Sequence, residues 1–204
     1  MANPALNTLL QEIRACSACA AHLPHEPRPV LRASPTARLL IVGQAPGRRV
    51  HETGIPWNDP SGDLLRVWLE LTREQFYDVS RIAIAPAGFC YPGTVRGADL
   101  PPRAECAPLW HPRLRALMPG IRLVLLVGRY AQDYYLGPGK ERVADTVRAY
   151  ACHLRQGFFP LPHPSPRNRL WLRRNSWFEQ EVLPALRVQV ASVMEPAQAP
   201  MRAR

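Results

Sequence analysis

Apolar runs and helical patterns alternate along most of this chain. Four mostly apolar runs have the length of a buried strand: 38–42, 81–85, 123–127 and 157–161. Patterns with helical spacing follow the first three runs: 62–71, 103–117 and 130–136. Buried strands that alternate with helices are typical of parallel sheets with helices on both faces. The sequence therefore predicts an α/β fold whose central, mainly parallel sheet has four strands.

The segments before and after the first strand carry further signals. Residues 6–13 have leucine and isoleucine at helical spacing, which predicts a short amphipathic helix whose last turn leads to Cys16. A Gly- and Pro-rich loop over residues 43–60 follows the first strand, and Asp59 or Ser61 would cap the next helix. Because such sheets bind ligands beyond the carboxyl ends of their strands, we expect the functional residues in these loops.

The C-terminal part of the chain reads as helix. Residues 167–193 have a helical pattern, and Pro184 predicts a break or kink within it. The chain has 204 residues, of which 47% are hydrophobic, and this is enough for the core of one ordinary domain. We expect residues 1–195 to form that single domain and residues 196–204 to form a disordered tail.

The net charge of the chain limits the kinds of partner that it is expected to bind. Lys and Arg total 26 against 16 Asp and Glu, and the net charge of +10 favours nucleic acid or an anionic membrane surface. No apolar run approaches the roughly 20 residues that span a bilayer. The first ten residues also lack the basic start and apolar run of a secretory signal. We therefore expect a cytoplasmic protein without a membrane partner.

Five cysteines in such a chain favour metal binding over disulfides, because cytosolic thiols are kept reduced. Two residues separate Cys16 from Cys19, and fifteen separate Cys90 from Cys106. Four thiolates can hold a 4Fe-4S cluster or a tetrahedral zinc ion, and the spacing alone does not distinguish these. Cys152 is best interpreted as a small buried apolar residue.

Two motifs stand at the ends of predicted strands. The first is Gly43-Gln44-Ala45-Pro46-Gly47, continued by Thr53-Gly54-Ile55-Pro56-Trp57, and the second is His163-Pro164-Ser165-Pro166-Arg167-Asn168. Together with the cysteine spacing, they resemble the motifs of the uracil-DNA glycosylase superfamily, above all its bacterial iron-sulfur families. The resemblance covers about residues 9–186.

This resemblance implies a three-layer α/β/α sandwich and a glycosylase that removes uracil from DNA by hydrolysis, leaving an abasic site. The substrate would be uracil-containing DNA, single- or double-stranded. The resemblance also favours iron over zinc, so that a structural 4Fe-4S cluster would be held by Cys16, Cys19, Cys90 and Cys106. We expect a monomer that needs no soluble cofactor.

The resemblance also assigns roles to residues. His163 would donate a hydrogen bond to the uracil oxygen as negative charge develops there, and Trp57 would stack on the extruded base. Base edges would be bound by the motif residues Gln44, Ala45, Pro46 and Gly47. The segment after the last strand would contact DNA through Ser165, Arg167, Asn168 and Arg169.

The chain departs from the family pattern at two places. Where many relatives have an acidic residue in the first motif, it has Gln44 and Ala45. The Gln44 amide could still orient a water molecule, and His51 or Glu52 could also position it.

The second departure lies after the second strand. Residues 85–89 lack the asparagine with which many relatives bind the uracil edge, and Asn58, Asp59 or backbone groups near Gly88 are the candidate replacements. Base specificity therefore stays open to hypoxanthine and xanthine. A catalytically inactive protein that binds uracil-DNA or abasic sites is the strongest alternative function, and a basic nucleotide-binding or hydrolase module is a weaker one.

Overall fold

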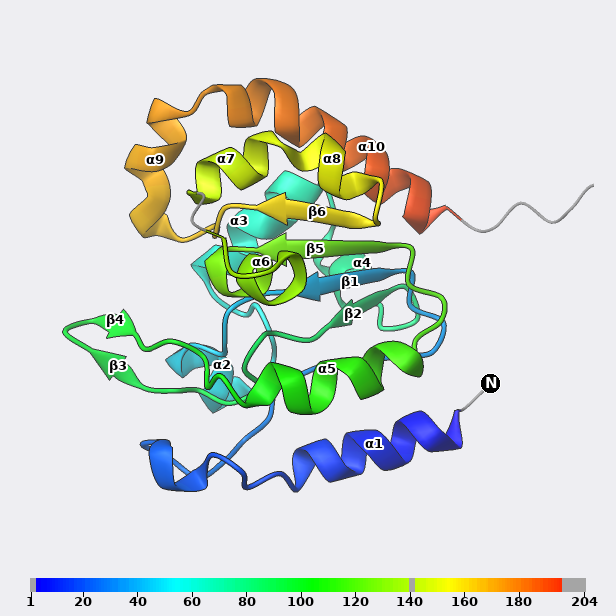
Figure 1. The fold of residues 1–204 in the computed structure, drawn as a ribbon, viewed down its shortest axis with the longest axis vertical. Coiled ribbons are helices and arrows are strands. Elements are labelled where there is room, and N and C mark those ends of the chain that lie inside the picture. Colours follow the sequence, from blue (N-terminus) through cyan, green and yellow to red (C-terminus); the bar gives the residue numbers. More distant parts are fainter. Residues whose placement is uncertain (1–2, 140–141, 196–204) are drawn as a thin grey trace, which may run out of the picture.

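A parallel sheet of four strands forms the centre of the fold (Figure 1). The computed structural model describes residues 3–139 and 142–195. The strand order is β2-β1-β5-β6, and each neighbouring pair is parallel. The strands are β1 Leu39–Val42, β2 Ile82–Ile84, β5 Leu123–Val127 and β6 Phe158–Leu161. This confirms the predicted α/β class and the four parallel strands.

Alternating residues of the strands enter two separate hydrophobic cores, as the period of a strand requires. In β1, Leu39 and Ile41 point to one core, and Leu40 and Val42 point to the other. The first core packs against the helices α3 Pro60–Leu69, α7 Val143–Arg148 and α10 Leu183–Met194. The second packs against α1 Pro4–Arg14, α5 Cys106–Ala116 and α6 Arg129–Leu136. Helices on both faces make three layers.

The N-terminus of α3 shows why the sequence begins a helix there. Asp59 is the N-cap, and its Oδ1 accepts a hydrogen bond from the Gly62 amide at 2.8 Å. Pro60 stands in the first turn, where backbone amides have no partner within the helix, so its missing amide hydrogen costs no helical hydrogen bond. Of the two predicted caps, Asp59 is the one that caps the helix, and Ser61 lies inside it.

Several short helices and strands lie where the sequence predicted a loop or where it predicted no helix or strand. The predicted loop 43–60 contains α2 Arg48–Thr53. Short helices occur as α4 Arg73–Tyr77 and α8 Tyr150–Leu154. A two-stranded hairpin, β3 Thr94–Val95 and β4 Ala98–Asp99, projects from the body of the fold (Figure 1).

The C-terminal region corrects one expectation. The predicted helix over residues 167–193 is divided into α9 Arg169–Arg174, a π-helical segment Phe178–Val182 and α10. The interruption lies at residues 175–176, not at Pro184. Pro184 stands in the first turn of α10, directly after the π-helical segment.

The predicted tail over residues 196–204 lies outside the described residues. Among the described helices, none is long and apolar enough to cross a membrane.

The aromatic cluster around Phe178 allows a test of the first core. Phe178 is fully buried, and its ring meets Trp68 edge-on with centroids 4.9 Å apart. Phe178→Ala should lower the free energy of unfolding by about 3–5 kcal/mol, because it removes the ring and leaves a cavity. Denaturant unfolding measures this. The control is Val188→Ala on the exposed side of α10, expected to change stability by about 0.5 kcal/mol or less. Equal losses would contradict this description of the core.

Candidate active site

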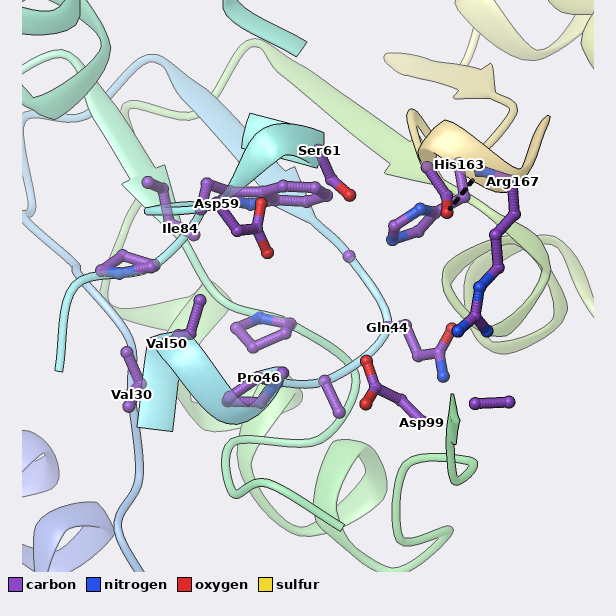
Figure 2. A pocket seen from close by; sticks show the side chains of 18 of the residues that line it. Val30, Gln44, Pro46, Val50, Asp59, Ser61, Ile84, Asp99, His163 and Arg167 are labelled. Carbon is purple, nitrogen blue, oxygen red and sulfur yellow. Dashed lines mark hydrogen bonds between the residues drawn. The ribbon is translucent and has the colours of Figure 1, made fainter. Parts of the chain in front are cut away.

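A cavity of about 410 Å³ opens beyond the carboxyl ends of the strands (Figure 2). Four segments form most of its wall: the loop after β1, the segment that leads into α3, the β3–β4 hairpin and the segment after β6. Val30, Val50, Ile84 and Pro86 add apolar surface. The cavity therefore joins residues that lie far apart in the sequence, at the edge of the sheet where the motifs were expected.

The first motif is fixed by backbone hydrogen bonds to the loop after β2. The amide of Ala87 donates to the Gly43 carbonyl, and that of Gly88 donates to the Gln44 carbonyl, both at 2.9 Å. The side chain of Gln44 reaches across to the hairpin, where its amide donates to the Leu100 carbonyl at 3.3 Å. These hydrogen bonds hold the first motif in place along one side of the cavity.

Trp57 has an unusual backbone conformation, with φ at 57°. Arg66, almost fully buried, donates to the Trp57 carbonyl at 3.3 Å, and Tyr77 donates to the preceding Pro56 carbonyl at 2.8 Å. A non-glycine residue in this region stores about 1–3 kcal/mol of strain, which persists only because neighbours hold it. The result is that the indole ring lines the cavity at a fixed orientation.

His163 follows β6 and faces Trp57, with ring centroids 5.7 Å apart and an angle of 32° between the planes. The Asn168 side chain donates to the His163 carbonyl at 2.8 Å and so fixes the turn of the second motif. Burial lowers the pKa of His163, although the carboxylates of Asp59 and Asp99 act in the opposite direction. At neutral pH the imidazole is therefore neutral and has one N–H to donate.

The loop after β2 supplies Pro86 to the cavity wall. A hydrogen bond from His111 holds this loop in place. The His111 Nε2 lies 3.0 Å from the Pro86 carbonyl oxygen, and its Nδ1 lies 2.8 Å from the Tyr135 hydroxyl. A carbonyl only accepts, so Nε2 carries the hydrogen and Nδ1 accepts from Tyr135. Burial lowers the pKa of His111 to about 4, which keeps this pair of bonds intact at neutral pH.

Most of the predicted site residues meet at this cavity. Those that line it are Gln44, Ala45, Pro46, Gly47, Trp57, His163, Ser165, Arg167 and Asn168. Ser165 also caps the turn that contains Arg167, accepting a hydrogen bond from its amide at 3.3 Å. Asp59, considered as a replacement for the missing base-binding residue, lines the cavity as well.

Other predicted residues lie elsewhere. His51 projects from α2 toward the rings of His25 and Tyr91, at centroid distances of 5.3 and 5.7 Å, and its Nδ1 is buried without a partner among the described residues. Glu52 is exposed, and Asn58 accepts a hydrogen bond from Arg73 at 3.1 Å.

Gly88 belongs to the wall of a second cavity, and Arg169 is exposed at the start of α9. Neither lines the first cavity.

The hairpin adds residues that sequence reasoning missed, above all Asp99 and Ala98 in the cavity wall. Its turn is Arg96-Gly97, and both residues have positive φ, 48° and 76°. A two-residue turn of this kind is typical of tight hairpins and often contains glycine at its second position. Gly97 was therefore a sequence signal for the turn of the hairpin. The two strands could not be predicted, because two residues are too few to show an alternation of apolar and polar positions.

The four predicted metal ligands line the second cavity together: Cys16, Cys19, Cys90 and Cys106. Burial raises the pKa of Cys90 to about 11 and that of Cys106 to about 12. The described residues contain no group of three or more His, Cys, Asp or Glu side chains arranged to hold a metal ion. Cys152, predicted to be buried, is exposed on α8, because Tyr150 and Leu154 are the α8 residues that pack against the first core.

The comparison with protein families gives the class of this molecule. The model of the uracil DNA glycosylase superfamily matches residues 32–187, well over half of the chain. The chain belongs to this superfamily, and this membership indicates uracil-DNA glycosylase-type activity in DNA repair. The matched segment contains both motifs, Cys90 and Cys106, but begins after Cys16 and Cys19.

The electrostatics of the site predict how His163 titrates. NMR should give a midpoint below the ordinary value of about 6.5, because burial disfavours the imidazolium. Asp59→Asn and Asp99→Asn should each lower the midpoint further, since each removes a negative charge that stabilises the cation. The control is Asp145→Asn at an exposed position of α7, outside the cavity lining, which should leave the His163 midpoint unchanged. A His163 midpoint above 6.5 would contradict the described burial.

Proposed function

We propose that this protein is a monofunctional glycosylase that hydrolyses the N-glycosidic bond of uracil in DNA and leaves an abasic site. The observation that carries the proposal is the meeting of Trp57 and a neutral His163 in one cavity that residues of both motifs line. An aromatic platform and a hydrogen-bond donor facing it are what excision of a flat, polar base requires.

Binding begins with extrusion of the base from the stack, which costs a few kcal/mol. Stacking on Trp57 offsets part of this cost and tolerates any planar base. Around it, Val30, Val50 and Pro86 give the base an apolar surround from which water is displaced. The preset orientation of Trp57 reduces the side-chain ordering that binding would otherwise require.

Bond cleavage places negative charge on the departing base and positive charge on the sugar. A neutral imidazole N–H of His163, directed at the uracil oxygen, stabilises this developing negative charge. The stabilisation is largest in a site that contains little water. The neighbouring carboxylates, Asp59 and Asp99, favour positive charge nearby and so suit the sugar cation. The base would leave as an anion, without needing a strong acid.

DNA contacts would come from basic and polar groups at the mouth of the cavity. Ser165 and Arg167 line it, and α9 adds exposed arginines beside them: Arg169, Arg173 and Arg174. These groups and the net charge of +10 favour phosphate binding, which weakens steeply as salt rises.

The proposal includes a structural 4Fe-4S cluster in the cysteine cavity. Its support is that Cys16, Cys19, Cys90 and Cys106 line one cavity, since four thiolates are the ligand set of such a cluster. Buried thiols with raised pKa values ionise only when a cation stabilises the thiolate. The Phe89 amide donates to the Cys106 sulfur at 3.3 Å, and the buried Arg103 Nε–H at the same cavity has no hydrogen-bond partner within the described part of the chain.

The cluster would cross-link α1, the loop after β2 and the start of α5, and it would supply stability without a catalytic step. Cys16 follows α1, Cys90 lies beyond β2, and Cys106 begins α5. Loss of the cluster would release the ends of these elements together.

The test of the proposed function is single-turnover cleavage of a labelled oligonucleotide with one uracil, single-stranded or opposite G or A. Hypoxanthine and xanthine substrates define the base specificity. His163→Ala should lower the cleavage rate constant by about 10²–10³-fold, the usual effect of losing one such donor, and change DNA affinity far less. Asn168 is left intact, so the turn stays anchored.

His153→Ala, on α8 and away from the cavity lining, is the matched control and should cleave at the wild-type rate. Tight binding of uracil-DNA without cleavage by the wild-type protein would instead support the non-catalytic binding protein. A flat salt dependence would favour a small-molecule substrate.

The cluster makes a separate prediction about cysteine variants. Cys90→Ser and Cys106→Ser should lose bound iron and visible absorbance, and their melting temperatures should fall by several degrees, because a structural metal site contributes folding energy. Cys152→Ser is the control, since this side chain is exposed and outside the cavity. Iron loss without a stability change would contradict the structural role, and zinc in the native protein would contradict the cluster.

A further inference from the structure

Excision by hydrolysis needs a group that positions water, and the first motif supplies no carboxylate. Its second and third residues are Gln44 and Ala45. The Gln44 side chain is engaged with the Leu100 carbonyl, and Ala45 has no polar atom beyond its backbone. Two carboxylates nevertheless line the cavity, Asp59 and Asp99, and Figure 2 shows both directed into it from different walls.

The hydrogen bonds of the two carboxylates differ. Asp59 is the N-cap of α3 through its Oδ1. Asp99 accepts at Oδ1 from the Thr94 hydroxyl at 2.9 Å, and Thr94 lies 2.5 Å from the Tyr91 hydroxyl. Thr94 has one hydroxyl hydrogen and gives it to Asp99, so Tyr91 must donate to Thr94. Two donors in series thus orient one oxygen of Asp99.

The other oxygen of Asp99 lies against the first motif. A methyl group built on Gly47 would come within 3.3 Å of Asp99 Oδ2. The hairpin brings the carboxylate to the place where the motif itself lacks one. Two contacts hold the hairpin there: Arg167 donates to the Gly97 carbonyl, and the Gln44 amide donates to the Leu100 carbonyl.

We propose that Asp99 is the catalytic residue that positions the attacking water through Oδ2, with Thr94 and Tyr91 as its positioning residues. The inference rests on the proposed glycosylase function. The N1–C1′ bond breaks and its electron pair leaves with the base, while the water oxygen forms the new bond to C1′. A water proton passes to Asp99, and the base anion is held by the donor on His163.

The test compares Asp99→Asn with Asp59→Asn in single-turnover cleavage at saturating enzyme. Asp99→Asn keeps the shape of the side chain and should lower the rate constant by about 10²–10⁴-fold, the range of general acid–base catalysis. Affinity for an oligonucleotide with a non-cleavable uracil nucleotide should stay at the wild-type value. Asn is as good an N-cap as Asp, so Asp59→Asn retains α3 and reports on its charge alone.

Two further variants separate chemistry from structure. Thr94→Val removes the donor to Oδ1 and should reduce the rate constant less than Asp99→Asn does, without changing binding. Asp145→Asn, at an exposed position of α7, is the control and should match the wild-type protein. Thermal melts of all variants establish that each is folded.

The outcomes are distinct. If the wild-type protein cleaves and Asp99→Asn cleaves equally fast, Asp99 has no catalytic role and the proposed function stands. A loss confined to Asp59→Asn overturns the assignment in favour of that carboxylate. If Asp99→Asn loses affinity for the non-cleavable DNA as strongly as it loses rate, Asp99 contacts DNA instead of water. A wild-type protein that never cleaves removes the proposed function and this inference together.

Discussion

The close packing of Trp57 between two glycines is the constraint on which the rest of the site depends. A side-chain carbon at Gly62 would lie 1.8 Å from the Trp57 carbonyl oxygen, and one at Gly43 would lie 2.7 Å from the indole ring. Only glycine leaves room at either position. Gly43 directly follows β1, and Gly62 lies in the first turns of α3, so the tryptophan links the sheet edge to the helix. Because both contacts are with rigid elements, the ring is held at one orientation toward His163.

The segment between Cys90 and Cys106 connects the two cavities. It leaves the cysteine cavity at Cys90, passes Tyr91, forms the β3–β4 hairpin at the mouth of the first cavity and returns to Cys106. A hairpin with strands of two residues has little stability of its own. Its position depends on anchoring at both ends and on Arg167, which donates to the Gly97 carbonyl. This gives a physical reason for the proposed cross-link at the cysteines, because a group that fixes Cys90 and Cys106 also limits where Asp99 can lie.

Burial keeps the two histidines of the site region neutral, for different purposes. His111 is almost fully covered and uses both ring nitrogens to hold the loop that carries Pro86. His163 has its pKa lowered by burial, while two carboxylates at the cavity favour its cation. Opposing effects of this kind set a side chain to donate a hydrogen bond without carrying a full charge, which suits a leaving group that departs as an anion.

The sequence by itself determined the sheet, the two motifs and the cysteine set. Strand runs of aliphatic residues, such as 123–127, are decided by local composition, and the motifs follow strands whose carboxyl ends must meet at one edge. Only the tertiary structure decided which polar residues share the cavity. Asp99 sits on a hairpin too short to show a pattern, and His51 and Glu52 lie close in sequence to the first motif, yet α2 carries them away from the cavity lining. Local periodicity fixes the strands of the sheet and the longer helices that follow the first three, but the direction in which a loop side chain points is set by packing between distant segments.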